Sequence, residues 1–101
     1  GQISAALACG NKVIVKPSEH TSILGYLVVK KFHDLGIPSD ALELILGDGY
    51  YGEALTKIVP LHGVAFTGSL QTAKKIQKNL LRNQNQIVLL FYVILDAFYL
   101  D

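Results

Sequence analysis

The sequence has no methionine, a single cysteine and few charged residues, which make up 17% of its 101 positions. One cysteine, Cys9, excludes an internal disulfide and is typical of a protein from a reducing compartment. The net charge of +1 gives no reason to expect a nucleic acid or an acidic membrane as partner. Because methionine is absent even from the first position, we expect a piece of a longer chain.

The sequence also lacks an apolar run long enough to cross a bilayer. It does not begin with the positively charged segment of a signal peptide. We therefore predict no membrane span and a cytoplasmic location. The last residues, 87–100, are apolar but too short for a span and contain Asp96. Without a partner, this tail is expected to behave as a misplaced strand that favours aggregation.

Short apolar runs, rich in β-branched residues, alternate with segments of helical periodicity. The runs at 12–16 (KVIVK), 42–46 (LELIL) and 63–66 (GVAF) predict three strands. A helix ends near residue 8 at a left-handed Gly10, and a second, capped by Thr21, ends at Gly36 and Pro38. Two further helices are predicted at 52–59 and after Ser69, the latter with Ala73, Ile76, Leu80 and Leu81 facing inward. This order predicts an α/β fold, with a Rossmann-like βαβαβ parallel sheet and flanking helices.

Candidate binding residues gather where the predicted strands end. Residues 16–19 (KPSE), 47–52 (GDGYYG) and 67–69 (TGS) all follow a strand and lead into a helix. Ligands of open parallel sheets bind beyond these carboxyl ends, and helix N-termini favour phosphate. The pattern Gly47-x-Gly49-x-x-Gly52 is typical of dinucleotide-binding turns. Two interpretations stay open on spacing alone, because the glycines could equally just turn the chain and Ser69 just cap its helix.

Other reactive side chains favour structural roles. Cys9 lies among alanines with no basic neighbour in the sequence, so we expect a buried structural thiol rather than a nucleophile. His20, His33 and His62 show no ligand spacing, so no metal site is predicted. The lysines of residues 73–82 (AKKIQKNLLR) are expected to form a solvated helix face. A nucleic-acid-binding module is disfavoured because no aromatic platform accompanies these lysines.

Three ordered segments, ALACGNKVIVKPSEHT, LGIPSDALELILGDG and GVAFTGS, resemble the coenzyme-binding domain of the aldehyde dehydrogenase superfamily. The segments GQISAALACGN and HGVAFTGSLQTAKKIQKNL are most similar to the L-glutamate γ-semialdehyde (1-pyrroline-5-carboxylate) dehydrogenase branch, often part of a bifunctional proline-catabolising enzyme. The resemblance implies a partial NAD-binding domain at residues 1–82, followed by a divergent apolar tail at 83–101. It also implies NAD as cofactor, an aldehyde substrate and an intact enzyme that is homo-oligomeric.

The same resemblance implies roles for individual residues near the coenzyme. Lys16 and Glu19 match the family residues at the adenosine ribose, with Ser18 between them. Gly49 and Gly52 match glycines on the adenine side, although the family usually has one more residue between them. Ser69 matches the serine at the pyrophosphate. Thr67 and Gly68 match residues near the nicotinamide end, and the same motif includes Phe66.

No catalytic residue is expected in this chain. The family's nucleophile is a cysteine of a separate catalytic domain, and its general base is a glutamate in an E-[LT]-G-G segment. Neither motif occurs here, and the tail reads NQNQIVLLFYVILDAFYLD instead, as a frame-shifted or decayed sequence would. The sequence thus predicts a dehydrogenase fragment without turnover. The alternative is a non-catalytic nucleotide-binding or interaction remnant of such an enzyme.

Overall fold

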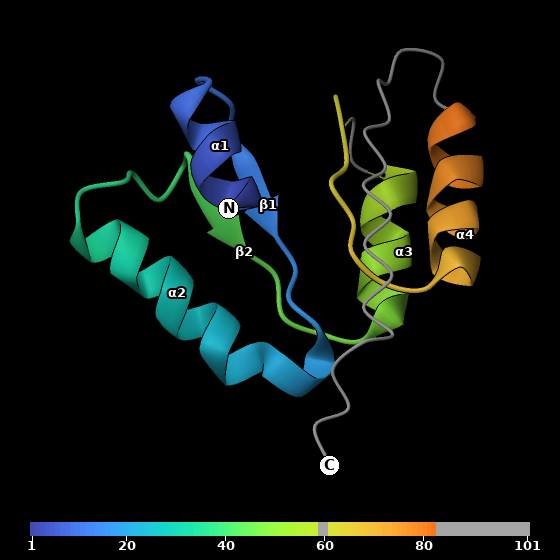
Figure 1. The fold of residues 1–101 in the computed structure, drawn as a ribbon, viewed down its shortest axis with the longest axis horizontal. Helices are drawn as coiled ribbons and strands as arrows, with labels where there is room; N and C mark the ends of the chain where they lie inside the picture. Colours follow the sequence, from blue (N-terminus) through green and yellow to red (C-terminus); the bar gives the residue numbers. More distant parts are fainter. Residues whose placement is uncertain (59–60, 83–101) are drawn as a thin grey trace. The chain divides into compact units, whose positions relative to one another are not determined.

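A computed structural model of the chain describes residues 1–58 and 61–82 (Figure 1). The predictions made for residues 59–60 and for the tail at 83–101 lie outside these residues. The chain divides into two compact units, Gly1–Gly52 and Glu53–Asp101.

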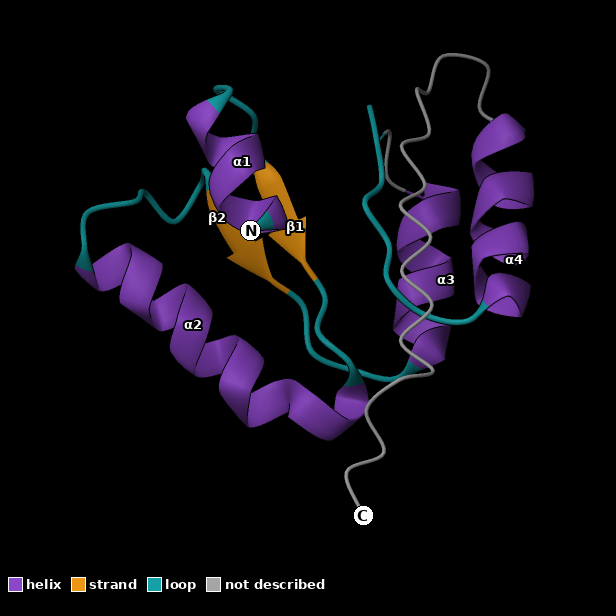
Figure 2. Ribbon diagram, in the orientation of Figure 1, coloured by secondary structure: helices purple, strands orange, loops and turns teal. Residues whose placement is uncertain are grey.

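The first unit is a β-α-β arrangement with a parallel sheet (Figure 2). Helix α1 (Gln2–Ala8) precedes strand β1 (Val13–Val15), and the 3₁₀ helix η1 (Glu19–Thr21) leads into α2 (Ser22–Asp34) and strand β2 (Leu42–Leu44). The strands pair in parallel, with Val13 opposite Leu42 and Val15 opposite Leu44. Helix α1 contacts β1, and α2 contacts β2. The predicted α/β class, with a parallel sheet and flanking helices, is confirmed.

Both predicted glycine stops are confirmed by backbone angles. Gly10 has φ +80° after α1, and Gly36 has φ +103° after α2, a region that side chains with a Cβ rarely adopt. At Gly36 the chain also forms the paired hydrogen bonds of a Schellman ending. The Ile37 amide donates to the Phe32 carbonyl, and the Gly36 amide donates to the His33 carbonyl.

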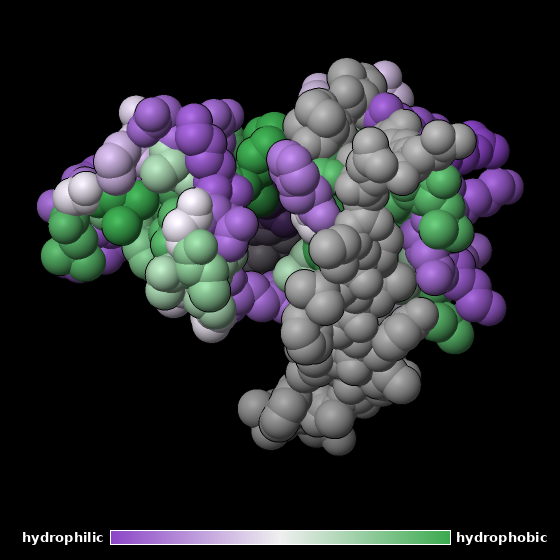
Figure 3. All heavy atoms as spheres, turned by 90° about the horizontal axis from the view of Figure 1, so that it is seen from above, coloured by the Kyte–Doolittle hydropathy of each residue, from purple (hydrophilic) through white to green (hydrophobic). Residues whose placement is uncertain are grey.

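Helix α2 packs through Gly25, Val29 and His33, and not through the apolar residues whose helical spacing predicts this helix. Gly25 lies against the ring of Pro17, Val29 is 3% exposed, and His33 Nε2 lies 2.8 Å from the Leu42 carbonyl oxygen of β2. The apolar Ile23 and Leu24 are instead 78% and 61% exposed. Figure 3 shows that apolar side chains reach the surface of the coloured residues on the face it draws. The helical period of apolar residues therefore predicts the helix but not the face that contacts the sheet.

Thr21 occupies the N-cap position of α2, as predicted, but it does not cap the helix through its side chain. The Thr21 hydroxyl makes no capping bond to the helix and donates instead to the Ser18 carbonyl at 3.2 Å. Ser18 Oγ accepts from the His20 amide, so Ser18 caps the preceding 3₁₀ turn. The extra turn of η1, which the sequence pattern did not indicate, moves the side-chain cap three residues toward β1.

Helix α3 (Gly49–Ile58) begins at Gly49 rather than at the predicted Gly52. Its first turn is stabilised by Asp48, whose Oδ1 accepts from the Tyr50 amide at 3.0 Å. The glycine-rich stretch is therefore a short loop followed by a helix start, so that Gly49 and Gly52 lie in the helix and not before it.

Helix α4 (Leu70–Leu81) is capped by Ser69 as predicted, with Ser69 Oγ accepting from the Thr72 amide at 3.2 Å. Ala73 and Leu80 are buried, which confirms half of the predicted inward face. Leu81 is 71% exposed, so its predicted inward position is wrong. Asn79 is buried in its place because its side-chain amide donates to Thr56 Oγ1 of α3 at 3.1 Å.

The third strand expected at residues 63–66 is absent from the described residues, whose sheet contains only β1 and β2. A strand is defined by hydrogen bonds with a neighbour, and residues 63–67 have no regular structure. A run of four residues with strand composition is not sufficient to fix such a pairing.

Candidate functional site

The end of β1 and the start of α3 meet at two predicted coenzyme residues, Lys16 and Gly52. Lys16 follows β1 directly and is half-buried. A Cβ placed on Gly52 would lie 3.3 Å from both Cδ and Cε of Lys16. The first turn of α3 therefore packs against the aliphatic stem of this lysine. The absence of a side chain at Gly52 leaves that approach open.

The charged end of Lys16 is held locally. Its Nζ donates to the Pro17 carbonyl at 3.0 Å, which uses one of the three ammonium donors. The two remaining donors can reach hydroxyl or carbonyl oxygens of a ligand without breaking this contact.

Glu19 and Ser18 lie on the next turn of the chain. Ser18 Oγ accepts from the His20 amide, and the Glu19 carboxylate is exposed with Oε1 3.7 Å from His20 Nε2. Both residues thus belong to the segment that follows Lys16, as predicted. The Ser18 hydroxyl serves as a helix cap, whereas the Glu19 carboxylate faces solvent and is available as an acceptor.

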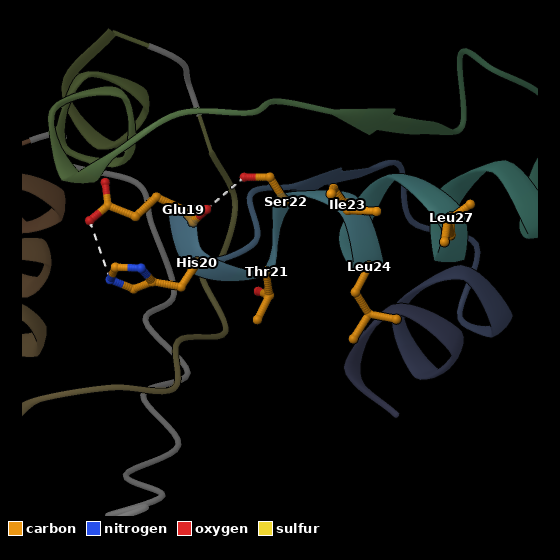
Figure 4. Close-up of a pocket in the computed structure, with 7 residues that line it drawn as sticks. All are labelled: Glu19, His20, Thr21, Ser22, Ile23, Leu24 and Leu27. Atoms are coloured by element: carbon orange, nitrogen blue, oxygen red, sulfur yellow. Dashed lines mark hydrogen bonds and ion pairs between the residues drawn. The ribbon is translucent and has the colours of Figure 1, made fainter.

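A shallow hollow of about 420 Å³ adjoins Glu19 at the start of α2 (Figure 4). One end of it is polar, where Ser22 Oγ donates to the Glu19 carbonyl at 3.0 Å. The other end is apolar. The other lining residues are not among the predicted site residues and follow Glu19 along η1 and α2: His20, Thr21, Ser22, Ile23, Leu24 and Leu27.

The glycine motif divides between loop and helix. Gly47 lies in the loop after β2, Gly49 is the first residue of α3, and Gly52 lies in its first turn. A Cβ at Gly49 would meet no atom within 4 Å, in contrast to one at Gly52. Of the two predicted adenine-side glycines, only Gly52 therefore stands in close contact with another predicted site residue.

The remaining predicted residues belong to the second unit. The Phe66 ring lies over Gly68, where an added Cβ would come within 2.6 Å of Phe66 Cζ. Thr67 is exposed, and Ser69 begins α4 with its hydroxyl bonded to both the amide and Oγ1 of Thr72. The structure thus brings Lys16 and Gly52 together in the first unit, and Phe66 and Gly68 together in the second.

Cys9 is exposed, which corrects the expectation of a buried thiol. It forms the C-cap of α1, a seven-residue helix in which no residue is buried. Alanine-rich surroundings in the sequence predicted burial, but a short helix at the edge of the unit does not supply the neighbours that burial requires.

Within residues 1–58 and 61–82, no three His, Cys, Asp or Glu side chains gather as ligands for a metal ion. The same residues contain no helix of the length and apolarity that a membrane crossing needs. The described residues provide hydrogen-bonding groups for a ligand. These groups are a lysine and a carboxylate after β1, and backbone amides at the starts of α3 and α4. Such groups can hold hydroxyls and phosphates.

Comparison with known proteins supports one family. The sequence model of the Aldehyde dehydrogenase family matches residues 1–91, which includes part of the segment set apart as a divergent tail. The chain is 45% identical over 80 residues to the Bifunctional protein PutA of Rhizobium meliloti, covering 79% of this chain and 6% of that protein. It is 38% identical over 90 residues to N-succinylglutamate 5-semialdehyde dehydrogenase 1 of Caulobacter vibrioides, covering 89% of this chain and 19% of the relative.

Solved structures agree with the sequence comparison. A crystal structure of bifunctional proline utilization A (PutA) protein superposes with a TM-score of 0.84 and 42% identity. The match covers 91% of this chain and 9% of that one, so the chain spans a small part of the length of each relative. Because the family match extends over most of its residues, the chain belongs to the aldehyde dehydrogenase family.

Proposed function

We propose that this chain is part of the NAD-binding domain of an aldehyde dehydrogenase that oxidises L-glutamate γ-semialdehyde to L-glutamate in proline catabolism. The observation that carries the proposal is the contact between Lys16 and Gly52. It joins the end of a parallel strand to a helix start, which is where α/β proteins bind dinucleotides.

The residues around this contact fit an adenosine ribose. A lysine donor and the Glu19 carboxylate acceptor follow the same strand, and ribose hydroxyls both donate and accept hydrogen bonds. Gly52 keeps the neighbouring helix turn free of a side chain that would fill the space beside Lys16. We assign Lys16 and Glu19 to the ribose, with Ser18 positioning the turn between these two residues. We assign Gly49 and Gly52 to the adenine side.

The second unit supplies the residues proposed for the rest of the coenzyme. Ser69, at the start of α4, is assigned to the pyrophosphate because the first amides of a helix and its dipole favour anions. Phe66, Thr67 and Gly68 precede it and are assigned to the nicotinamide end. The nicotinamide, when bound, supplies the acceptor for the hydride that leaves the aldehyde carbon.

The choice of substrate rests on similarity to relatives. Identity is 45% to the PutA protein of Rhizobium meliloti, and the PutA crystal structure superposes closely. The second candidate is N-succinylglutamate 5-semialdehyde, named in a relative that matches a longer part of this chain at 38% identity. Both candidates are aldehydes derived from glutamate and differ at the amino group.

We further propose that this chain alone does not turn over, because hydride transfer in the family starts from a cysteine adduct. The one thiol, Cys9, caps the end of α1 before β1. The alternative function, a nucleotide-binding or interaction remnant, shares the coenzyme site and lacks the reaction. The cytoplasmic location and the homo-oligomeric state of the intact enzyme stay predictions.

Calorimetric titration of the chain with NAD tests the role of Lys16. Lys16→Ala is expected to weaken binding by about 1.5–3 kcal/mol, the range for a hydrogen bond to a charged group. The matched control is Lys12→Ala, which removes an exposed lysine from the opposite end of β1 and should change the affinity little. If the two variants bind NAD equally, Lys16 is not at the ribose.

A further inference from the structure

A second hollow, of about 260 Å³, lies between α3 and α4 and contains none of the predicted coenzyme residues. Helix α4 lines it with residues spaced as one helix face: Lys75, Lys78, Asn79 and Arg82. Helix α3 lines it with Glu53 and Lys57, which are one turn apart. We call this hollow the α3–α4 groove.

The α3–α4 groove is strongly positive. Four of its lining residues are cations and one is an anion, so four minus one leaves a formal charge of +3. Glu53 is bonded to Lys57, whose Nζ lies 2.5 Å from Oε1. This hydrogen bond, together with the nearby charges of Lys57 and Lys75, lowers the pKa of Glu53. Among the described residues, Lys75, Lys78 and Arg82 form no ion pair.

The base of the groove is fixed by a buried hydrogen-bond chain. Asn79, 8% exposed, donates from Nδ2 to Thr56 Oγ1 at 3.1 Å, and the Thr56 hydroxyl donates to the Glu53 carbonyl at 2.8 Å. The bond between Asn79 and Thr56 joins the two helices, and Asn79 itself lines the groove. The lysines and the arginine therefore line one concavity. Cations that only contact solvent on a helix face would not need this arrangement.

We propose that the α3–α4 groove binds a small anion that carries adjacent phosphate groups, such as pyrophosphate. A guanidinium matches phosphate oxygens in a bidentate arrangement, and ammonium groups add point charges. The small volume and a charge of +3 suit a compact, multiply charged anion better than a long polymer. The Asn79 amide at the base adds a neutral polar group to the cations.

The test is a titration of the ¹⁵N-labelled 101-residue chain with sodium pyrophosphate at constant ionic strength, followed by amide chemical shifts. We expect the largest shifts at residues that line the α3–α4 groove. The double variant Lys78→Gln/Arg82→Gln should weaken binding by about tenfold or more, since it removes two charge-assisted contacts. The matched control Lys74→Gln removes a lysine of the same helix that does not line the groove, and should stay within about twofold.

Glu53→Gln provides a test in the opposite direction. It removes the one carboxylate and releases Lys57, so pyrophosphate should bind about threefold more tightly or better. Circular dichroism spectra of each variant check that it keeps its helices. Three results would overturn the proposal: no saturable shifts in the groove, equal weakening by Lys74→Gln, or shifts confined to residues 67–69. Binding of a single-stranded oligonucleotide without binding of pyrophosphate would also overturn it.

Discussion

Gly25 of α2 packs closely against the ring of Pro17 in the first unit. A Cβ placed there would lie 2.5 Å from Cγ and 2.7 Å from Cβ of Pro17, so one of the two elements would have to move. We predict that Gly25→Ala lowers the free energy of unfolding by about 1–3 kcal/mol, the usual cost of overpacking. Urea unfolding of the whole chain measures this difference.

Gly49→Ala is the matched control for that measurement. Gly49 also lies in a helix, and an added Cβ there meets no atom within 4 Å. Alanine is the better helix former, so this variant should be unchanged or more stable by up to about 1 kcal/mol. Equal destabilisation by both substitutions would show that Pro17 does not restrict Gly25.

Residue roles that depend on neighbours in the chain were predictable from the sequence. Ser69 as a cap, and Gly10 and Gly36 as stops, follow from local backbone chemistry and are confirmed. Thr21 lies at the N-cap of α2 as predicted but makes no side-chain capping bond, and the prediction that Cys9 is a buried thiol was wrong. The first depended on an extra 3₁₀ turn, and the second depended on elements that pack around α1, neither of which local sequence specifies.

At the scale of elements, helices α3 and α4 are joined by a hydrogen bond between two buried side chains, Asn79 and Thr56. We predict that Thr56→Val and Asn79→Ala each destabilise the chain, because each leaves a buried polar partner unsatisfied at a cost of about 1–3 kcal/mol. The double variant should cost less than the sum, with a coupling of about 1 kcal/mol. A double-mutant cycle in urea measures it, and strictly additive effects would show that the bond contributes nothing.

Element boundaries show where sequence periodicity stops being informative. The helices and the two parallel strands were predicted, as was the meeting of the segments after β1 and β2 that brings Gly52 to Lys16. The face of α2 that packs against the first unit was not predictable from apolar spacing. It consists of Gly25, Val29 and His33, of which only Val29 has an apolar side chain. The strand expected at 63–66 required a pairing partner that composition cannot supply.

On the scale of the whole molecule, we predict that the purified 101-residue chain does not oxidise aldehydes. Positioning of reactive groups supplies much of an enzyme's acceleration, and Cys9 is an exposed helix cap rather than a positioned nucleophile. The measurement is NADH formation with L-glutamate γ-semialdehyde and with N-succinylglutamate 5-semialdehyde. Turnover by the chain that disappears in Cys9→Ser would assign the nucleophile to Cys9 and refute this prediction.

The central claim is that the chain binds a nicotinamide coenzyme at the end of β1, with the Glu19 carboxylate beside the ribose. Calorimetric titration with NAD and with NADP, on the chain and on Glu19→Gln, tests this claim most directly. A carboxylate at this position accepts from ribose hydroxyls and repels a 2′-phosphate, so NAD should bind more tightly than NADP. Glu19→Gln should reduce the difference in affinity between NAD and NADP. A chain that binds neither coenzyme, or that binds NADP more tightly, would contradict the claim.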